Sequence, residues 1–506
     1  MLKGLQVSKK EIINFRKKTN GKKIVLCHGA FDIVHPGHLD HLENAKKLGD
    51  ILVVTITADH FLKKHLHSPL YNQNERLSFL KKFKIIDYVF IVNSGSAMHS
   101  LNIIKPHYYC KGTEYKKNDF IGNLNVEKKV AKNINCKIVY LGSNVNSSSK
   151  IFAENFFEIK DNELKNEILK NKKYDLVELF KKISKLKILV IGETIIDKYG
   201  YLDLKGISPK SGILSYVKRK EDYMFGGALA SFIFLKSFIK DVTFISLASK
   251  NQPNKNIRKL LKKHNLIRSE DYHDIIKERL MDLSQDNKIK KLITVNEYKD
   301  QNLTYKDEKK ILSQINKQAS KCDLIIAQDF GHNLFSDKII RKLEKFKNKL
   351  SINVQTNSLN FGYNIIKKFK KTNIFSLDER ELKLSSSKKI INFETEMIKL
   401  TKKLNAKHGY LTLGGKYSLI TDGNNCIKIS TLNKNPIDTM GAGDVFHALS
   451  SVASIVNNNM FINLFLSQIA GAHAVSILGN STHPSIDQVI RTYNFYLQSI
   501  VNQKDK

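Results

Sequence analysis

The chain has 506 residues, of which 42% are hydrophobic and 26% are charged, with a formal net charge of +36. This length suggests two or three domains, each able to bury a core, and the hydrophobic content excludes a mainly disordered chain. The charge leaves three classes of partner: nucleic acid, an anionic membrane surface, or small acidic substrates.

The distribution of the basic residues favours small acidic substrates. Lysines are dispersed along the whole chain, often in pairs, and arginine is scarce. Arginine-rich segments with interleaved aromatic residues, which are typical of nucleic-acid recognition, are absent from the sequence. We therefore expect a solvated basic surface and no nucleic-acid partner. A basic nucleic-acid-binding or regulatory protein with vestigial sites is the alternative.

Cysteine spacing and apolar runs predict the compartment. The five cysteines lie far apart, without a CxxC pair or a Cys/His cluster, which argues against a disulfide framework and for a reducing cytosol. The first residues, MLKGLQVSKKEIINF, lack the apolar core of a signal peptide, and no run approaches bilayer length. We expect a cytoplasmic protein without membrane insertion.

The first half opens with a strand, a helix and a second strand. Residues 22–27 and 51–57 are β-branched runs, and the apolar spacing from Leu39 to Leu48 between them is helical. This order predicts a βαβ unit in a parallel sheet, whose ligands bind beyond the carboxyl ends of the strands. His35 and His38 fall at that edge, beside a helix start that favours phosphate.

The string around these histidines, GAFDIVHPGH, resembles the GxFDxxHxGH motif of the cytidylyltransferase-like nucleotidyltransferases. The resemblance implies that His35 and His38 stabilise the α-phosphate of a nucleotide while a phosphate attacks and pyrophosphate leaves. It also implies nucleotide contacts for Gly29 and Phe31 and a substrate contact for Asp32.

Three later segments resemble the same family. Residues 74–76 precede a helical pattern, and Lys111 follows a strand-like run, where the resemblance implies a nucleotide contact. A serine-rich helix start that holds the β- and γ-phosphates in the family is matched by Ser147, Ser148 and Ser149. We expect a Rossmann-like domain over residues 1–157 and a polar, partly helical linker over residues 158–185.

A second succession of strands and helices follows the linker. Buried strands are predicted from Leu186, Cys322, Leu350, Asn373 and His408. The stretch PIDTMGAGDVFHAL then places a glycine-rich turn at a helix start, where backbone N–H groups and the helix dipole attract an anion. Asp444 follows this turn at once and is placed to take a proton from an attacking hydroxyl; the plainer interpretation is a helix cap.

This stretch resembles the DTxGAGD signature of the ribokinase-like (PfkB) sugar kinases. The resemblance implies a three-layer α/β kinase domain over residues 186–506, with Asp444 as the general base. It implies that the transferring phosphoryl group and ATP contact Gly414, Gly441, Ala442 and Gly443, and that the sugar phosphate contacts Asp197, Gly226, Gly227 and Arg279. Ala230 and Lys210 depart from the family pattern, which leaves the identity of the sugar open.

The acidic pair Asp378 and Glu381 follows a predicted strand. It resembles the family element that organises Mg²⁺ through water, and an acidic pair that favours a helix N-terminus is the equal alternative.

The two halves together resemble the bifunctional heptose 7-phosphate kinase/heptose 1-phosphate adenylyltransferases, with the order of the domains reversed. The resemblance implies ATP-dependent phosphorylation of a sugar phosphate and transfer of AMP to a sugar 1-phosphate, giving a nucleotide sugar for surface glycans. ATP, Mg²⁺ and small sugar phosphates would be the cofactors and partners. The alternative is a CTP-dependent enzyme for another alcohol phosphate, and a homodimer is left open.

Overall fold

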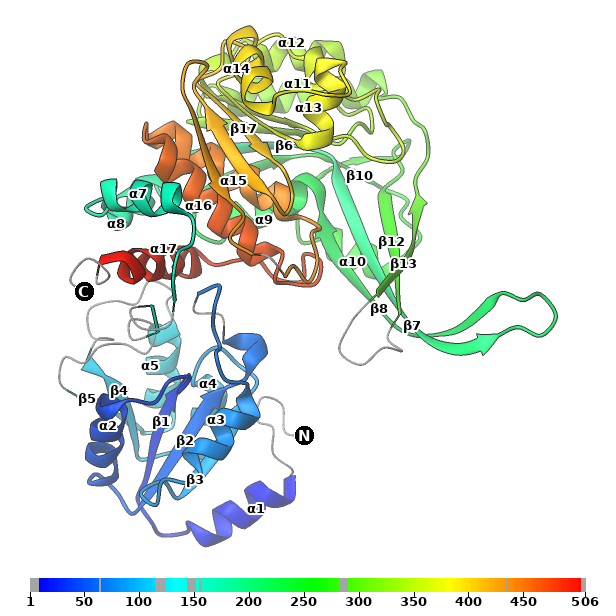
Figure 1. Ribbon diagram of the computed structural model, residues 1–506. Coiled ribbons are helices and arrows are strands. Elements are labelled where there is room, and N and C mark those ends of the chain that lie inside the picture. Colours follow the sequence, from blue (N-terminus) through cyan, green and yellow to red (C-terminus); the bar gives the residue numbers. More distant parts are fainter. Residues whose placement is uncertain are drawn as a thin grey trace. The chain divides into compact units, whose positions relative to one another are not determined.

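The computed structural model describes residues 9–62, 65–113, 123–142, 152–153, 157–282, 290–433 and 435–501. They form two compact units (Figure 1). Unit 2 is Lys173–Ser485, and unit 1 combines the described residues before it with the last helix, α17 (Ile486–Val501).

Unit 1 is built on a five-stranded sheet with the strand order β3-β2-β1-β4-β5, and every pair in it is parallel. Strand β2 is buried at each position, and every residue in it except Leu52 is β-branched, as suits a parallel strand covered on both faces. The strands are β1 (Ile24–Gly29), β2 (Ile51–Thr57), β3 (Tyr88–Val92), β4 (Tyr108–Gly112) and β5 (Lys137–Leu141).

Helices cover both faces of this sheet. One face carries α2 and α3 through Leu42 and Leu80, and the other carries α1, α4 and α5 through Phe15, Leu101 and Ala131. The predicted βαβ unit and the Rossmann-like fold are thus confirmed. The helices are α1 (Lys9–Lys18), α2 (Pro36–Lys46), α3 (Gln73–Leu80), α4 (Met98–Ile104), α5 (Asn123–Asn133) and α7 (Asn162–Lys170).

Unit 2 contains an eight-stranded sheet with the order β19-β18-β17-β16-β15-β14-β6-β9, parallel except for the two pairs at the β19 edge. The five strands predicted from sequence appear as β6, β14, β15, β16 and β17. The strands are β6 (Lys187–Gly192), β9 (Asp241–Ile245), β14 (Leu324–Asp329), β15 (Leu350–Val354), β16 (Ile374–Asp378), β17 (His408–Thr412), β18 (Tyr417–Thr421) and β19 (Cys426–Ser430).

Helices again form a layer on each side, which confirms the predicted three-layer architecture. The layer of α11 (Tyr305–Ala319), α12 (Asp337–Glu344), α13 (Glu379–Ser386) and α14 (Phe393–Lys403) shares one large apolar core with the sheet. The opposite layer contains α8 (Leu176–Ile183), α9 (Gly227–Lys236), α15 (Ala442–Val456) and α16 (Met460–Ala474).

A second sheet of unit 2 has the order β13-β12-β7-β8. Its long hairpin of β7 (Thr194–Ile207) and β8 (Leu214–Gly226) extends away from the helical layers (Figure 1). Strand β12 (Ile275–Asp282) pairs with β7 in parallel and with β13 (Lys290–Glu297) in antiparallel. Smaller elements are β10 (Leu247–Ser249), α10 (Lys255–Leu261) and β11 (Ile267–Ser269).

The compact units do not coincide with the domain ranges expected from sequence. The stretch expected to be a linker, residues 158–185, contains helix α7 of unit 1 and helix α8 of unit 2. Helix α17, expected in the kinase domain, packs on α7 in unit 1, where the Tyr493 hydroxyl donates to the Asn171 carbonyl at 3.2 Å. In the described part of the chain, no helix is long and apolar enough to cross a bilayer.

Candidate active sites

The glycine turn of unit 2 begins helix α15, as its sequence predicts. Gly441 is the N-cap with a φ of 73°, and Ala442 and Gly443 form the first turn. A Cβ on Gly441 would collide with the amide of Asn480, so both the backbone angle and the space demand glycine at this position. The free N–H groups of the first turn point toward one place, which suits an anion.

Asp444 lies in the same turn with its side chain buried. Gln355 Nε2 donates to Asp444 Oδ1 at 2.7 Å, which fixes the orientation of the carboxylate. Burial raises the pKa of Asp444 to about 7, and the negative charge of Asp197 acts in the same direction. The hydrogen bond from Gln355 and the positive charge of Lys277 oppose this shift. A carboxylate with such a pKa can accept and release a proton near neutral pH.

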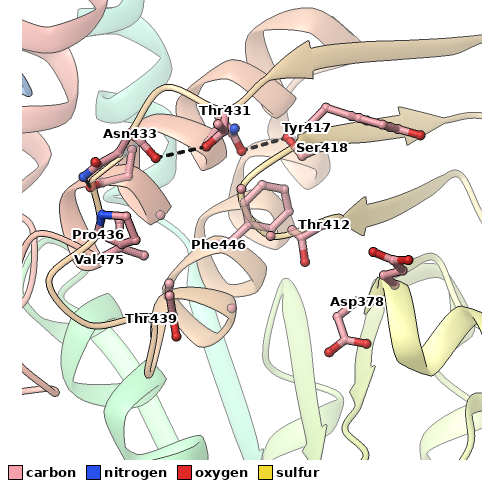
Figure 2. A pocket seen from close by; sticks show the side chains of 18 of the residues that line it. Asp378, Thr412, Tyr417, Ser418, Thr431, Asn433, Pro436, Thr439, Phe446 and Val475 are labelled. Atoms are coloured by element: carbon pink, nitrogen blue, oxygen red, sulfur yellow. Dashed lines mark hydrogen bonds between the residues drawn. The ribbon is translucent and has the colours of Figure 1, made fainter. Parts of the chain in front are cut away.

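A pocket of about 1000 Å³ opens beside the α15 turn (Figure 2). Its wall brings together four residues predicted from sequence, which are Gly414, Ala442, Gly443 and Asp378. Phe446 and Val475 supply apolar surface, and Thr412, Ser418 and Thr439 supply hydroxyl groups (Figure 2). A large pocket with small residues, some apolar surface and a helix N-terminus suits a nucleotide with its phosphates.

The acidic pair Asp378 and Glu381 forms a capping box at the start of α13. Asp378 Oδ1 accepts from the Glu381 N–H at 2.7 Å, and Glu381 Oε2 accepts from the Asp378 N–H at 2.8 Å. Glu381 is buried, which raises its pKa to about 8, and its second oxygen accepts from the Thr356 N–H. Glu381 therefore fits a direct Mg²⁺ contact poorly, whereas the carboxylate of Asp378 is exposed at the pocket.

The residues predicted to contact the sugar also come together. Asp197 on β7 and Arg279 on β12 form a buried ion pair with 2.5 Å between Asp197 Oδ1 and Arg279 Nη1. A Cβ on Gly226 would approach Asp197 Oδ2 to 2.5 Å, and Gly227, with a φ of 60°, would press a Cβ against the Glu193 carbonyl. The glycines thus make room for Asp197 and for the tight start of α9.

Several residues of this site were not among the predicted ones. Lys277 lies opposite Asp197 in the register of β12 with β7, and burial lowers its pKa. Asp438 Oδ2 accepts from the Tyr199 hydroxyl and the Gly479 N–H, and its Oδ1 accepts from Lys291 Nζ at 2.5 Å. These contacts tie the glycine turn to the second sheet. The sequence signals for them were the acidic residue at the start of the signature and, for Lys277, its place two residues before Arg279.

The histidine pair of unit 1 lies at the carboxyl edge of its sheet, as expected. His35 is the N-cap of α2 and Pro36 its first residue, and the His38 N–H bonds to the His35 carbonyl at 2.8 Å. This turn brings the two imidazole rings to a centre-to-centre distance of 4.0 Å. Phe31, with a φ of 49°, packs on the His38 ring at 5.3 Å.

The remaining predicted residues of unit 1 have structural partners. The carboxylate of Asp32 accepts from the N–H groups of Leu70 and Tyr71 at 2.9 Å. A Cβ on Gly29 would come within 3.1 Å of the Phe31 ring, which explains the glycine at that position. Lys111 Nζ pairs with Glu127 Oε2 at 2.5 Å. The predicted nucleotide contacts Ser147, Ser148 and Ser149 lie outside the described residues.

Metal binding finds limited support in the geometry. Among the described residues no group of three or more His, Cys, Asp or Glu side chains is arranged to hold a metal ion. The side-chain hydroxyl of Thr439 and the carboxylate of Asp378 are among the polar groups that line the pocket. Mg²⁺ commonly relies on one or two carboxylates together with water and substrate phosphates, so Asp378 fits an ion carried in with a nucleotide.

Unit 2 combines a three-layer α/β fold with a glycine turn at the start of a helix. A family model described as pfkB family carbohydrate kinase matches residues 185–460, more than half of the chain. The chain therefore belongs to the pfkB family of carbohydrate kinases. A second model, described as cytidylyltransferase-like, matches residues 26–241, which confirms the predicted class of unit 1. Its match runs past Lys172, although the structure assigns the segment after that residue to unit 2.

Curated relatives match a shorter stretch. Proteins named "Bifunctional protein HldE" are 38% identical over 104 residues in Aliarcobacter butzleri, 37% over 117 in Campylobacter jejuni and 33% over 129 in Desulfatibacillum aliphaticivorans. These matches cover 20%, 23% and 25% of this chain and 22%, 25% and 26% of the relatives. The chain thus spans about a quarter of the length of the curated relatives that it matches.

Two solved structures resemble part of this chain. Phosphofructokinase-2 from Escherichia coli, solved in complex with potassium, is 13% identical, with a TM-score of 0.48 over 62% of this chain and 99% of that one. Ribokinase from Thermotoga maritima is 18% identical, with a TM-score of 0.44 over 61% and 99%.

Proposed function

We propose that this protein is a bifunctional sugar-activating enzyme. Unit 2 phosphorylates the anomeric hydroxyl of a sugar phosphate similar to heptose 7-phosphate, using ATP. Unit 1 joins a nucleotidyl group, AMP, to a sugar 1-phosphate and releases pyrophosphate. The product is a nucleotide sugar of the kind used for surface glycans. The pairing of a pfkB unit with a cytidylyltransferase-like unit supports this combination of reactions.

The observation that carries the kinase proposal is the position of Asp444. Its buried carboxylate follows directly on Ala442 and Gly443, which line the pocket, and it lies close enough to Asp197 for that charge to raise its pKa. Asp444 takes the proton from the sugar hydroxyl while the oxygen attacks the γ-phosphorus of ATP, and ADP leaves. The N–H groups of the turn stabilise the charge on the transferring phosphoryl group.

Acceptor binding is assigned to the second sheet of unit 2. Asp197 accepts hydrogen bonds from sugar hydroxyls, while Lys277 and Arg279 on the same face of β12 bind the existing phosphate. Mg²⁺, when bound with ATP, neutralises phosphate charge during transfer. Asp378 would hold it through water, and Glu381 keeps the backbone of Asp378 in place.

The transferase reaction is assigned to the histidine turn of unit 1. An oxygen of the sugar 1-phosphate attacks the α-phosphorus of ATP, and the bond to the bridging oxygen of the leaving pyrophosphate breaks. His35 and His38 donate hydrogen bonds to the α-phosphate, with their rings held by the first turn of α2. Gly29 and Phe31 contact the nucleotide, and Asp32 contacts the sugar phosphate. Lys111 adds positive charge at the end of β4.

Two matched variants test the assignment with the full chain. Asp444→Asn keeps the shape of the side chain but removes the base, so we expect ADP formation from ATP and heptose 7-phosphate to fall at least about 100-fold. Pyrophosphate release from ATP and a sugar 1-phosphate should stay within about twofold. His38→Ala should have the opposite pattern, because the two reactions use different units.

Three outcomes would contradict the proposal. Loss of both reactions in either variant would argue against separate sites. Retained kinase activity in Asp444→Asn would remove Asp444 as the base. Pyrophosphate release with CTP and another alcohol phosphate, in place of ATP and a sugar 1-phosphate, would favour a cytidylyltransferase.

A further inference from the structure

Helix α17 is the last helix of the chain, yet it is part of unit 1. The pfkB match ends at residue 460, so α17 lies outside the part of the chain that the kinase family describes. Its buried side includes Tyr493, Phe495 and Tyr496. A helix that follows the kinase unit therefore contributes apolar surface to the unit that precedes it.

Phe495 and Tyr496 join an aromatic cluster in unit 1. The Phe495 ring stacks on His65 at 4.2 Å with an interplanar angle of 16°, and it lies 4.9 Å from the Phe157 ring. The Tyr496 hydroxyl lies 3.4 Å from His67 Nε2, within hydrogen-bond distance. Stacked aromatic contacts of this kind stabilise beyond their buried area. Helix α17 therefore packs against the segment that contains His65 and His67.

The segment from His65 to Tyr71 links this cluster to the histidine site. At its start, Ser68 Oγ accepts from the His65 N–H at 3.2 Å and donates to the His65 carbonyl at 3.1 Å. At its end, the N–H groups of Leu70 and Tyr71 both donate to Asp32 at 2.9 Å. Asp32 thus has its place set by the backbone of a segment whose other end is held by α17.

Arg76 links the same segment to the loop before His35 through hydrogen bonds. Its Nε donates to the Tyr71 carbonyl at 3.0 Å, and its Nη1 donates to the Ala30 carbonyl at 2.5 Å. The contacts therefore run without a break from Phe495 through His65 and Tyr71 to the loop of Ala30 and Asp32. His35 follows Asp32 by three residues on that loop.

We propose that Phe495 and Tyr496 of α17 are positioning residues for the N-terminal site, because they hold the segment His65–Tyr71 against Asp32. The transfer reaction of unit 1 then depends on the last helix of the chain. The reaction of unit 2 does not. The activity part of this inference rests on the proposed transferase function, whereas its structural part does not.

The test compares Phe495→Ala and Phe495→Leu with Asn494→Ala in the full chain. Asn494 is the exposed neighbour on the same helix and serves as the control. Hydrogen exchange followed by mass spectrometry should show the amides of residues 68–72 exchanging roughly tenfold faster in Phe495→Ala, while β1 and β2 stay protected. Phe495→Leu keeps the apolar bulk without the ring, so its effect should be smaller and it guards against loss of folding.

Activity supplies the second measurement. In Phe495→Ala, kcat/KM for pyrophosphate release should fall about tenfold because the Asp32 loop is misplaced, and ADP formation by unit 2 should stay within about twofold. Unchanged exchange at residues 68–72, or unchanged pyrophosphate release beside faster exchange, would overturn the proposal. If the unaltered protein releases no pyrophosphate, the transferase function itself fails, and the exchange result alone decides whether α17 holds the segment.

Discussion

Three buried carboxyl groups of unit 2 share a raised pKa but differ in what surrounds them. Burial is the main cause for Asp444 and Glu193, whose pKa values rise to about 7, and for Glu381, whose pKa rises to about 8. Glu193 accepts from the N–H groups of Phe330 and His332, and Glu381 from those of Thr356 and Asp378. Of the three, Asp444 alone is held by a side-chain amide at the turn beside the pocket.

The pH profile of the kinase reaction should report Asp444. Because the base must be deprotonated, kcat should fall as the pH decreases through about 7. Gln355→Leu removes a hydrogen bond that lowers the pKa, so the acid limb should move to higher pH. The position of the acid limb is measured by following ADP formation from about pH 5 to about pH 9, the range in which such a group titrates.

Gln314→Leu is the matched control, since Gln314 lies on the exposed part of α11. An acid limb that stays in place in Gln355→Leu, or moves equally in the control, would remove Asp444 as the titrating group.

Gly441 is the residue of the turn least able to change. Gly441→Ala places a Cβ against the Asn480 amide and forces alanine into the left-handed region, at a cost of roughly 1–2 kcal/mol for the backbone alone. We expect kcat/KM for ADP formation to fall at least about tenfold. Adding Asn480→Ala should restore part of the loss, since the collision is relieved and the backbone strain is not. Equal activity of the single and double variants would show that the collision has no role.

At the scale of elements, β12 shows which contacts a strand pattern can predict. The sequence predicts two strands with a polar turn over residues 276–297, and the structure contains them as β12 and β13. It does not predict that β12 pairs in parallel with β7, because that pairing joins strands some 80 residues apart without a local signal. Lys277 and Asp197 become neighbours only through this register.

Arg76 connects three elements of unit 1, and its loss should destabilise that unit. Its guanidinium donates to the carbonyls of Ala30 and Thr57 and to Asp59 Oδ1, and only 2% of the residue is exposed. Arg76→Leu leaves the buried carbonyls of Ala30 and Thr57 without this donor, whereas the partly exposed Asp59 carboxylate can turn to water. We therefore expect a loss of about 1–3 kcal/mol.

Calorimetry should show this as a lower midpoint for the unfolding of unit 1. The transition of unit 2 should be unchanged. Lys81→Leu, at the exposed end of the same helix, is the control. A midpoint for Arg76→Leu equal to that of the control would contradict a structural role for Arg76.

The sequence identified residues in short motifs, but it did not identify the residues that hold those motifs in place. Short strings at a strand end or helix start identified His35, His38 and Asp444, because local geometry brings such residues to an edge of the sheet. Asp197 was identified through the family resemblance alone, and it lies within strand β7. Gln355 and Lys291 were not predicted, because each contacts a site residue that is distant in sequence: Gln355 donates to Asp444, and Lys291 donates to Asp438. The roles of the predicted residues stay predictions until the variants are measured.

At the scale of the whole molecule, unit 1 is discontinuous in sequence. Its sheet lies in the first 141 residues, and its last helix starts at Ile486. The apolar spacing of residues 486–501 is typical of a helix. It does not specify which unit the helix joins, because the apolar face of a helix can pack on the apolar surface of either unit. The family resemblance identified both folds, and it placed residues 486–506 in the kinase domain range, whereas α17 packs in compact unit 1.

A discontinuous first unit reverses the order in which the two halves can be completed at the ribosome. Synthesis proceeds at about 5–20 residues per second, and each unit folds once its parts have emerged. Unit 2, made second, has all of its strands and helices before α17 is translated, whereas unit 1, made first, must wait for residues 486–501. A nascent chain arrested just before Ile486 would thus hold a complete unit 2, whereas unit 1 would still lack α17.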